Sequence, residues 1–297
     1  MEKITYQGWN NCVRLSNGLI ELIITADVGP RVIRFGFLDG QNEFDEDFLG
    51  VTGGDTWRNY GGHRLWHAPE HPVRTYAPDN GPIMVEEHDG FVRFIQPTEP
   101  STGIQKEMDI FLPATGTRVR VVHRLRNTNL WGVELAPWAL SVMAAGGTAI
   151  IPLPLRGSHD GNLLPAGTLT LWPYTDLADP RWTWGTEYLL LRQDPQATTP
   201  LKIGMRAHRG WIAYVRNGHL FVTYVTQQPG ASYPDLGSVI ESFTNARMLE
   251  IETLGPLAVL LPGSEIEYVE EWALFDGVPT PTCDADVAAI AALHSSQ

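Results

Sequence analysis

Short runs of hydrophobic residues, separated by glycine, proline, asparagine and aspartate, follow one another along nearly the whole chain. In Arg118–Arg126, valine and leucine alternate with arginine except at Val122–His123, which is close to the period of two that a β-strand with one basic face shows. Turn sequences such as DVGP, HDG, PATGT and NGHL separate neighbouring runs. The other predicted strands are Leu19–Thr25, Arg31–Leu38, Ile83–Glu87, Phe91–Gln96, Ile104–Leu112, Val133–Met143, Leu169–Trp172, Tyr188–Arg192, Trp211–Val215, Leu220–Val225, Val239–Phe243, Met248–Leu254 and Ile266–Phe275.

Only one segment has a good helical pattern. It is Asp284–His294, DADVAAIAALH, with Thr282 as a candidate N-cap. About fifteen strands and one helix predict an all-β fold, a large sandwich or barrel that ends in a short helix. No linker or repeat divides the chain, so we expect residues 1–297 to form a single domain. We interpret Ile151–Pro154 and the loop Trp172–Trp184 as surface excursions.

Composition narrows the range of partners. Hydrophobic residues make up 43% of the chain and charged residues 19%, as in packed globular proteins, and the net charge is −13. The acidic charge argues against nucleic acid or an anionic membrane as the main partner. The N-terminus lacks a signal-peptide pattern and no apolar run approaches the ~20 residues of a membrane span, so we expect a cytoplasmic protein. Cys12 and Cys283 form no CxxC motif, and a disulfide between them stays open.

The chain is rich in tryptophan and glycine, with ten Trp and 29 Gly. We expect most indoles to be buried. The remainder are candidate sugar platforms, because an indole face packs against the C–H face of a pyranose and its N–H is a donor.

Three segments resemble the aldose 1-epimerase (galactose mutarotase-like) superfamily. They are ADVGPRVIRF at Ala26–Phe35, RNTNLWGVELAPWALSVMAAGGTAIIPLP at Arg126–Pro154, and Tyr233–Phe275, which contains VIESFTNARMLEIETLGPLAVLLPG. The resemblance follows the strand order over nearly the whole chain and implies a β-supersandwich of two large twisted sheets. It also implies a carbohydrate ligand and no cofactor.

The resemblance implies a glutamate base that takes the anomeric proton and a histidine acid that protonates the ring oxygen. Glu252, in LEIETLGP, matches the base, and Glu250 lies on the same strand face two residues away. Glu241, on the preceding predicted strand, adds a third carboxylate. The alternative is a solvated acidic face. The position of the acid is filled by Pro137 and Trp138, and an indole cannot protonate a sugar at neutral pH.

The segment Gly61–His71 is the richest in chemistry, with three histidines, an arginine, a tryptophan and a glutamate after a Gly-Gly turn. We expect His63, ahead of His159, to supply the missing acid, because the pKa of histidine suits proton exchange at neutral pH. His63 and His67 have the spacing of a metal pair on a helix, but Gly and Pro69 break a helix here, so we expect no metal. The alternative to a functional site is that this segment is a structured loop. The expected sugar-contacting residues are Arg64, Trp66, His67, Trp138, His159, Trp184, Glu241 and Glu250.

Two functions compete. One is a sugar-active enzyme with Glu252 as base and a substituted acid. The other is a non-catalytic carbohydrate-binding or sensing protein that has lost the catalytic histidine. Titratable pairs with shifted pKa values in one cleft favour the enzyme, whereas aromatic and neutral polar groups alone favour the binder. A structural or assembly protein has no positive signal in the sequence.

Overall fold

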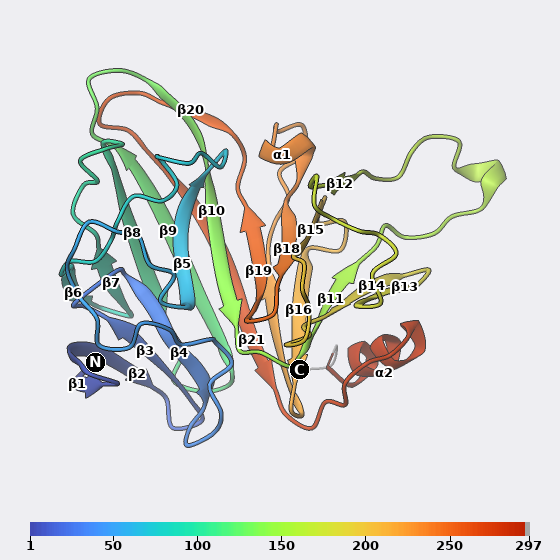
Figure 1. Cartoon of the computed structure of the whole chain (residues 1–297), viewed down its shortest axis with the longest axis horizontal. Helices are drawn as coiled ribbons and strands as arrows, with labels where there is room; N and C mark the ends of the chain where they lie inside the picture. Colours follow the sequence, from blue (N-terminus) through green and yellow to red (C-terminus); the bar gives the residue numbers. More distant parts are fainter. Residues whose placement is uncertain (295–297) are drawn as a thin grey trace.

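The computed structural model describes residues 1–294 as two antiparallel β-sheets packed face to face (Figure 1). The first sheet, in spatial order, consists of β1 (Glu2–Tyr6), β2 (Trp9–Ser16), β3 (Ile20–Thr25), β4 (Arg31–Phe37), β5 (Gly62–Ala68), β10 (Val133–Met143), β19 (Leu249–Leu254), β18 (Ile240–Thr244), β15 (Leu201–Met205) and β12 (Leu169–Leu171), with β20 (Ala258–Leu260) paired to β10.

The second sheet consists of β13 (Trp182–Trp184), β14 (Tyr188–Arg192), β11 (Thr148–Pro152), β16 (Trp211–Arg216), β17 (His219–Tyr224), β21 (Glu265–Phe275), β9 (Arg118–Asn127), β8 (Ile104–Phe111), β7 (Phe91–Ile95) and β6 (Met84–His88). Helical residues are few: a 3₁₀ turn (His159–Gly161), the single turn α1 (Pro234–Gly237) and α2 (Asp284–His294). The predicted all-β class and the predicted terminal helix are confirmed.

The two sheets bury their inner faces against each other. The inner residues of β10, such as Ala139 and Met143, join the main hydrophobic core, which both sheets line. At its centre four aromatic rings meet edge to face or tilted, with centroids 5.6–6.1 Å apart. These rings belong to Phe35, Phe44, Phe221 and Trp272.

Strand β5 is the main difference from the sequence-based prediction. We expected Gly61–His71 to be a loop, yet residues 62–68 form an entirely buried strand between β4 and β10. The segment has no alternation of apolar and polar residues because both faces of the strand are covered, so the pattern for a half-buried strand is absent. The interpretation of Ile151–Pro154 as a surface excursion is also corrected, because Thr148–Pro152 forms β11, inside the second sheet.

The Gly-Gly turn before β5 is required by the backbone. Gly61 and Gly62 have φ angles of +80° and +67°, in the left-handed region that favours glycine. A Cβ on Gly61 would collide with the carbonyl of Asp45, and one on Gly62 with that of Val32. The glycines therefore let β5 enter the sheet tight against its neighbours, which fixes its register.

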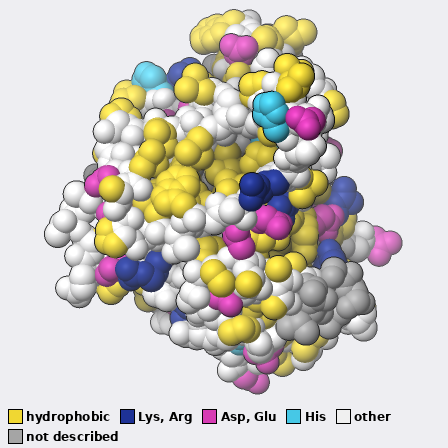
Figure 2. Space-filling model, turned by 90° about the vertical axis from the view of Figure 1, so that its right-hand side faces the viewer, with side chains coloured by type: hydrophobic (Ala, Val, Ile, Leu, Met, Phe, Trp, Pro, Cys, Tyr) yellow, Lys and Arg dark blue, Asp and Glu magenta, His cyan; other side chains and the backbone are white. Residues whose placement is uncertain are grey.

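Helix α2 lies at one side of the second sheet (Figure 1). Asp284, its first residue, accepts hydrogen bonds from the backbone N–H groups of Thr186, Glu187 and Tyr188. The loop 153–168 projects away from the body on the same side, and Figure 2 shows hydrophobic side chains around a hollow there. Within residues 1–294, no helix has the length and hydrophobicity needed to cross a bilayer.

Candidate functional site

Strand register gathers polar residues on the outer face of the first sheet, the face that points away from the second sheet. Residues directly opposite in an antiparallel pair share a face. Arg64 on β5 is opposite Leu140 on β10, which is opposite Glu252 on β19, which is opposite Glu241 on β18. We call the surface built on this row the cleft face.

Lys202 on β15 lies at the centre of the cleft face. Its Nζ is 2.8 Å from Glu252 Oε2 and 2.9 Å from Glu241 Oε2. The same nitrogen lies over two indoles, 4.8 Å from the ring centroid of Trp138 and 4.7 Å from that of Trp172. Burial alone would lower the pKa of Lys202, but the two carboxylates outweigh it and raise the pKa well above its usual value. Lys202 is therefore a fixed cation between aromatic walls.

Glu252 holds Lys202 and Trp138 in place from the buried side of the cleft. Its Oε2 accepts a hydrogen bond of 2.9 Å from Trp138 Nε1 as well as that from Lys202. The side chain is 0% exposed, whereas Lys202 and Trp138 line cavities. Glu252 therefore acts on the cleft indirectly, through its hydrogen bonds to Lys202 and Trp138.

Arg64 and Glu250 form a second charged pair on the cleft face. Arg64 Nη2 is 3.3 Å from Glu250 Oε1, and Arg64 Nη1 donates to the side-chain and backbone oxygens of Asn59. The guanidinium lies 4.4 Å from the ring centroid of Trp66. Burial lowers the pKa of Arg64 to about 10 and raises that of Glu250 to about 7, with Arg64 opposing the second shift. Glu250 is thus a carboxyl group that exchanges a proton near neutral pH.

Two adjoining cavities open above these groups, with volumes of about 600 and 270 Å³. The larger contains Trp172 and Asp235 in its wall, and the smaller contains Arg64 and Glu250. Both cavities are lined by Glu70, Tyr76, Trp138 and Lys202. Small-molecule sites are concave, aromatic and apolar with a few placed polar groups, and these cavities share that character.

Six expected site residues lie on the cleft face, namely Arg64, Trp66, Trp138, Glu241, Glu250 and Glu252. The structure separates His63 and His67 from them. Because β5 is a strand, alternate side chains point to opposite faces, and the two histidines point inward between the sheets. The expectation that His63 shares a face with Glu252 and Arg64 is therefore wrong.

The inward histidines also rule out the metal pair that their spacing suggests. Residues four apart on a strand are about 13 Å apart along the chain, too far to share an ion. His67 Nε2 is 4.0 Å from Glu99, and burial, followed by Lys106 and Arg74, lowers the pKa of His67 to about 3.

His159 and Trp184 lie elsewhere. The His159 side chain is fully exposed on the projecting loop 153–168. Trp184 is at the edge of the second sheet, on β13, where its Nε1 donates to the carbonyl oxygen of Leu177. Neither residue lines the cleft cavities.

Sequence reasoning missed the central residue of the site. Nothing in the sequence pattern marks Lys202, because only its neighbours in space, Glu241 and Glu252, identify it as a buried cation. Trp172 was expected only as part of the surface loop Trp172–Trp184. Glu70 lies in the segment Gly61–His71 but was not among the expected sugar-contacting residues. Tyr76 and Trp57 carried no signal, since their segments approach the cleft as loops.

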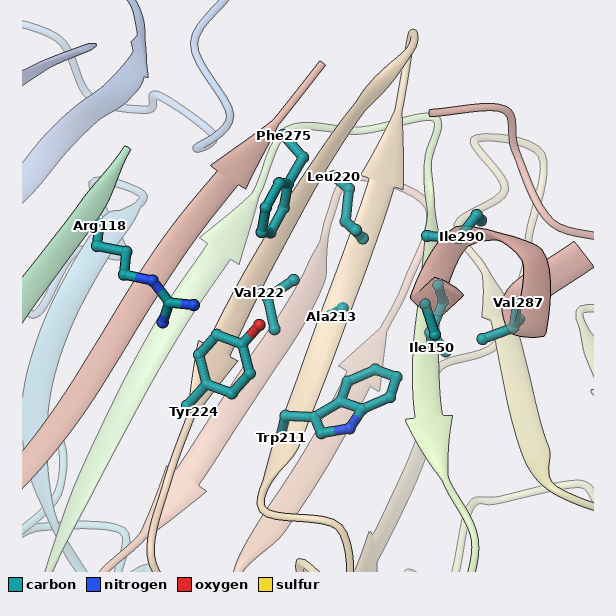
Figure 3. Close-up of a pocket in the computed structure, with 11 residues that line it drawn as sticks. Arg118, Ile150, Trp211, Ala213, Leu220, Val222, Tyr224, Phe275, Val287 and Ile290 are labelled. Carbon is teal, nitrogen blue, oxygen red and sulfur yellow. The ribbon is translucent and has the colours of Figure 1, made fainter. Parts of the chain in front are cut away.

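A further cavity, of about 290 Å³, lies on the opposite side of the molecule, on the outer face of the second sheet beside α2. Figure 3 shows Trp211, Tyr224 and Phe275 on the strands and Val287 and Ile290 on the helix around it. Arg118 is the one charged side chain in its lining. The described lining of this largely apolar hollow contains no carboxylate, and its side-chain donors are those of Arg118, Trp211 and Tyr224.

No family model matches the sequence, and comparison with curated proteins gives no match. Solved structures do match. A putative aldose 1-epimerase from Escherichia coli superposes with a TM-score of 0.54 at 13% identity, over 90% of this chain and 99% of that one. A galactose mutarotase-like protein from Lactobacillus casei gives 0.55 at 9% identity, over 89% and 100%. A putative mutarotase from Salmonella typhimurium gives 0.56 at 8% identity, over 90% of both chains. At such identities the likeness establishes the fold alone: the chain has a galactose mutarotase-like β-supersandwich fold.

Proposed function

We propose that the cleft binds a monosaccharide between Lys202 and the aromatic walls. The observation that carries the proposal is the fixed Lys202 ammonium, held by Glu241 and Glu252 and flanked by Trp138 and Trp172. An ammonium and a guanidinium donate to ring hydroxyls, carboxylates accept from them, and indoles pack against C–H faces. The fold, which putative mutarotases share, supports the same ligand class.

Within this proposal the proton-transfer group is Glu250. It lines the smaller cavity and its pKa of about 7 suits both giving and taking a proton at neutral pH. Lys202 keeps its proton, so its role is to stabilise negative charge that develops on a sugar oxygen. Glu252, expected as the base, takes a positioning role beneath Lys202 and Trp138.

The second candidate function, a binder without catalysis, rests on one observation. No histidine is among the described residues that line the two cleft cavities. An enzyme would therefore have to exchange protons through carboxyl groups alone. Both candidates predict sugar binding in the same place and differ only in turnover.

For either one we expect a cytoplasmic location, and Cys12 and Cys283, both free in the structure, fit a reducing compartment.

Calorimetric titration with a panel of neutral pyranoses, uronic acids and sugar phosphates tests the binding proposal. We expect at least one ligand to bind in the wild type and in Glu187→Gln, a control at an exposed carboxylate on the far sheet. Absence of heat or of competition for every sugar at about 10 mM, corresponding to less than ~3 kcal/mol of binding, would refute it. Polarimetry then separates the two functions. Faster mutarotation that Glu250→Gln slows by about 10²-fold supports the enzyme, and an unaccelerated rate supports the binder.

A further inference from the structure

Three ionisable side chains meet between the two sheets, away from the cleft. His63 comes from β5 in the first sheet, and His123 and Glu270 come from β9 and β21 in the second. All three are buried, with exposures of 0%, 0% and 2%. The cluster therefore joins the two layers of the fold at a point that the sugar proposal does not use.

The ligand atoms of the three side chains converge. His63 Nε2 is 2.7 Å from His123 Nε2 and 3.6 Å from Glu270 Oε2, and His123 Nε2 is 4.0 Å from the same oxygen. A triangle with these sides has a point about 2 Å from all three corners, and Zn²⁺ bonds to nitrogen and oxygen have that length. Tetrahedral zinc separates its ligand atoms by about 3.4 Å, so shifts below ~1 Å would complete the geometry.

The outward atoms of the three side chains are already held. His123 Nδ1 is 3.2 Å from the carbonyl oxygen of Tyr268, which can only accept, so the proton of this ring is on Nδ1 and the Nε2 lone pair points inward. His63 Nδ1 is 2.9 Å from Ser141 Oγ. Glu270 Oε1 accepts from Thr253 Oγ1, and Oε2, the atom that faces the two histidines, also accepts from Trp272 Nε1. Metal-binding histidines and carboxylates are oriented by outer partners of this kind.

Charge supports the same conclusion. Within residues 1–294, the ion-pair contacts of Glu270 are to His63 and His123, with no lysine or arginine among them. A carboxylate in a dry core needs a positive partner, and a bound cation would supply one.

We propose that His63, His123 and Glu270 bind one Zn²⁺ ion that links the two sheets. Two imidazoles and one carboxylate are a zinc-type donor set, and a closed, buried position favours a structural role over a catalytic one. The proposal is independent of the sugar site. It departs from the sequence-based expectation of no metal, because the partners of His63 come from strands that only the fold brings to it.

Metal analysis of the untagged protein tests the proposal. Because the cluster is sealed, the ion must enter during folding, so the protein is produced in zinc-supplemented medium and also refolded with Zn²⁺, Co²⁺, Fe²⁺, Mn²⁺ or Ni²⁺. We expect about one zinc per chain. Glu270→Gln and His123→Gln should lower the occupancy at least tenfold. His67→Gln, another inward histidine on β5, should keep it.

Two further measurements keep the test decisive if a variant fails to fold. The ion can be removed from the wild type by unfolding it in the presence of a chelator. Protein refolded without zinc should then have a lower Tm, and protein refolded with zinc should regain the original Tm. Co²⁺ in place of Zn²⁺ should give visible d–d absorption. Less than about 0.1 ion per chain under every loading condition, or equal binding by wild type and folded Glu270→Gln, would overturn the proposal.

Discussion

The two faces of β5 show how one short strand serves two environments. On the outer face, Arg64 and Trp66 meet Glu250 and Trp138 beside open cavities. On the inner face, His63 and His67 are sealed between the sheets, paired with Glu270 and Glu99. The outer groups line a cavity that a ligand can enter, whereas the inner histidines are sealed from it. Residue type alone does not separate these roles, since both faces carry basic and acidic partners.

The strongest test of this comparison removes one buried lysine from each side. Lys202→Met leaves Glu241 and Glu252 without their cation and should lower the free energy of unfolding by about 3–5 kcal/mol. It should also abolish sugar binding. Lys106, 2.5 Å from Glu99 beside His67, is the matched control.

Lys106→Met should cost comparable stability and leave sugar affinity within twofold. Urea unfolding and calorimetry on both variants measure the two effects. A sugar affinity that falls equally in both variants would mean that the faces are not functionally separate.

The aromatic wall gives the next largest effect. Trp172→Ala should weaken sugar binding about tenfold, because stacking against an indole contributes on the order of 1.4 kcal/mol. Stability should change little. Trp184→Ala, at an indole outside the cleft, should leave the affinity unchanged. The comparison fails if the two alanine variants bind alike.

The carboxyl groups predict a pH dependence with a definite sign. Burial raises the pKa of Glu250 to about 7 and that of Glu241 to about 8, so the folded state holds protons that the unfolded state has released. Stability from such groups is complete below their unfolded pKa and is lost as pH rises through the folded pKa.

Above pH 6.5 less than about half of the histidine side chains of the unfolded chain are protonated, so the carboxyl groups dominate. Urea unfolding at a series of pH values should show the free energy of unfolding falling from about pH 6.5 to 8. The fall should be smaller in Glu250→Gln. A wild-type curve that rises over this window would show that Glu250 is ionised at neutral pH.

The smallest effect is expected at His159. Its side chain is fully exposed on the projecting loop, so His159→Ala should change the free energy of unfolding by less than about 0.5 kcal/mol and leave sugar affinity and any turnover unaltered. Thermal melting and calorimetry check this. A loss of binding would mean that the loop 153–168 closes over a ligand.

The sequence patterns identify elements whose signal is local. Strand β9 shows alternation, and α2 begins and ends at the predicted residues, Asp284 and His294. Strand β5 escaped detection because both its faces are buried, and its glycines, histidines and arginine read as a loop. The site was foreseen in part, through the carboxylates, Arg64 and Trp138. Lys202 was not, because a buried lysine is recognised by its cross-strand partners, which register alone determines.

The register of β5 also governs how this chain can change in length over evolution. One residue inserted between Gly62 and His63 would turn His63 toward the cleft and force Arg64 between the sheets, losing both proposed sites at once. Gly61 and Gly62, pressed against the carbonyls of Asp45 and Val32, leave little room to absorb such a slip. Insertions and deletions should therefore collect in connections such as 69–83 and 153–168. In any future alignment of relatives, a gap placed inside 62–68 is best treated as an alignment error.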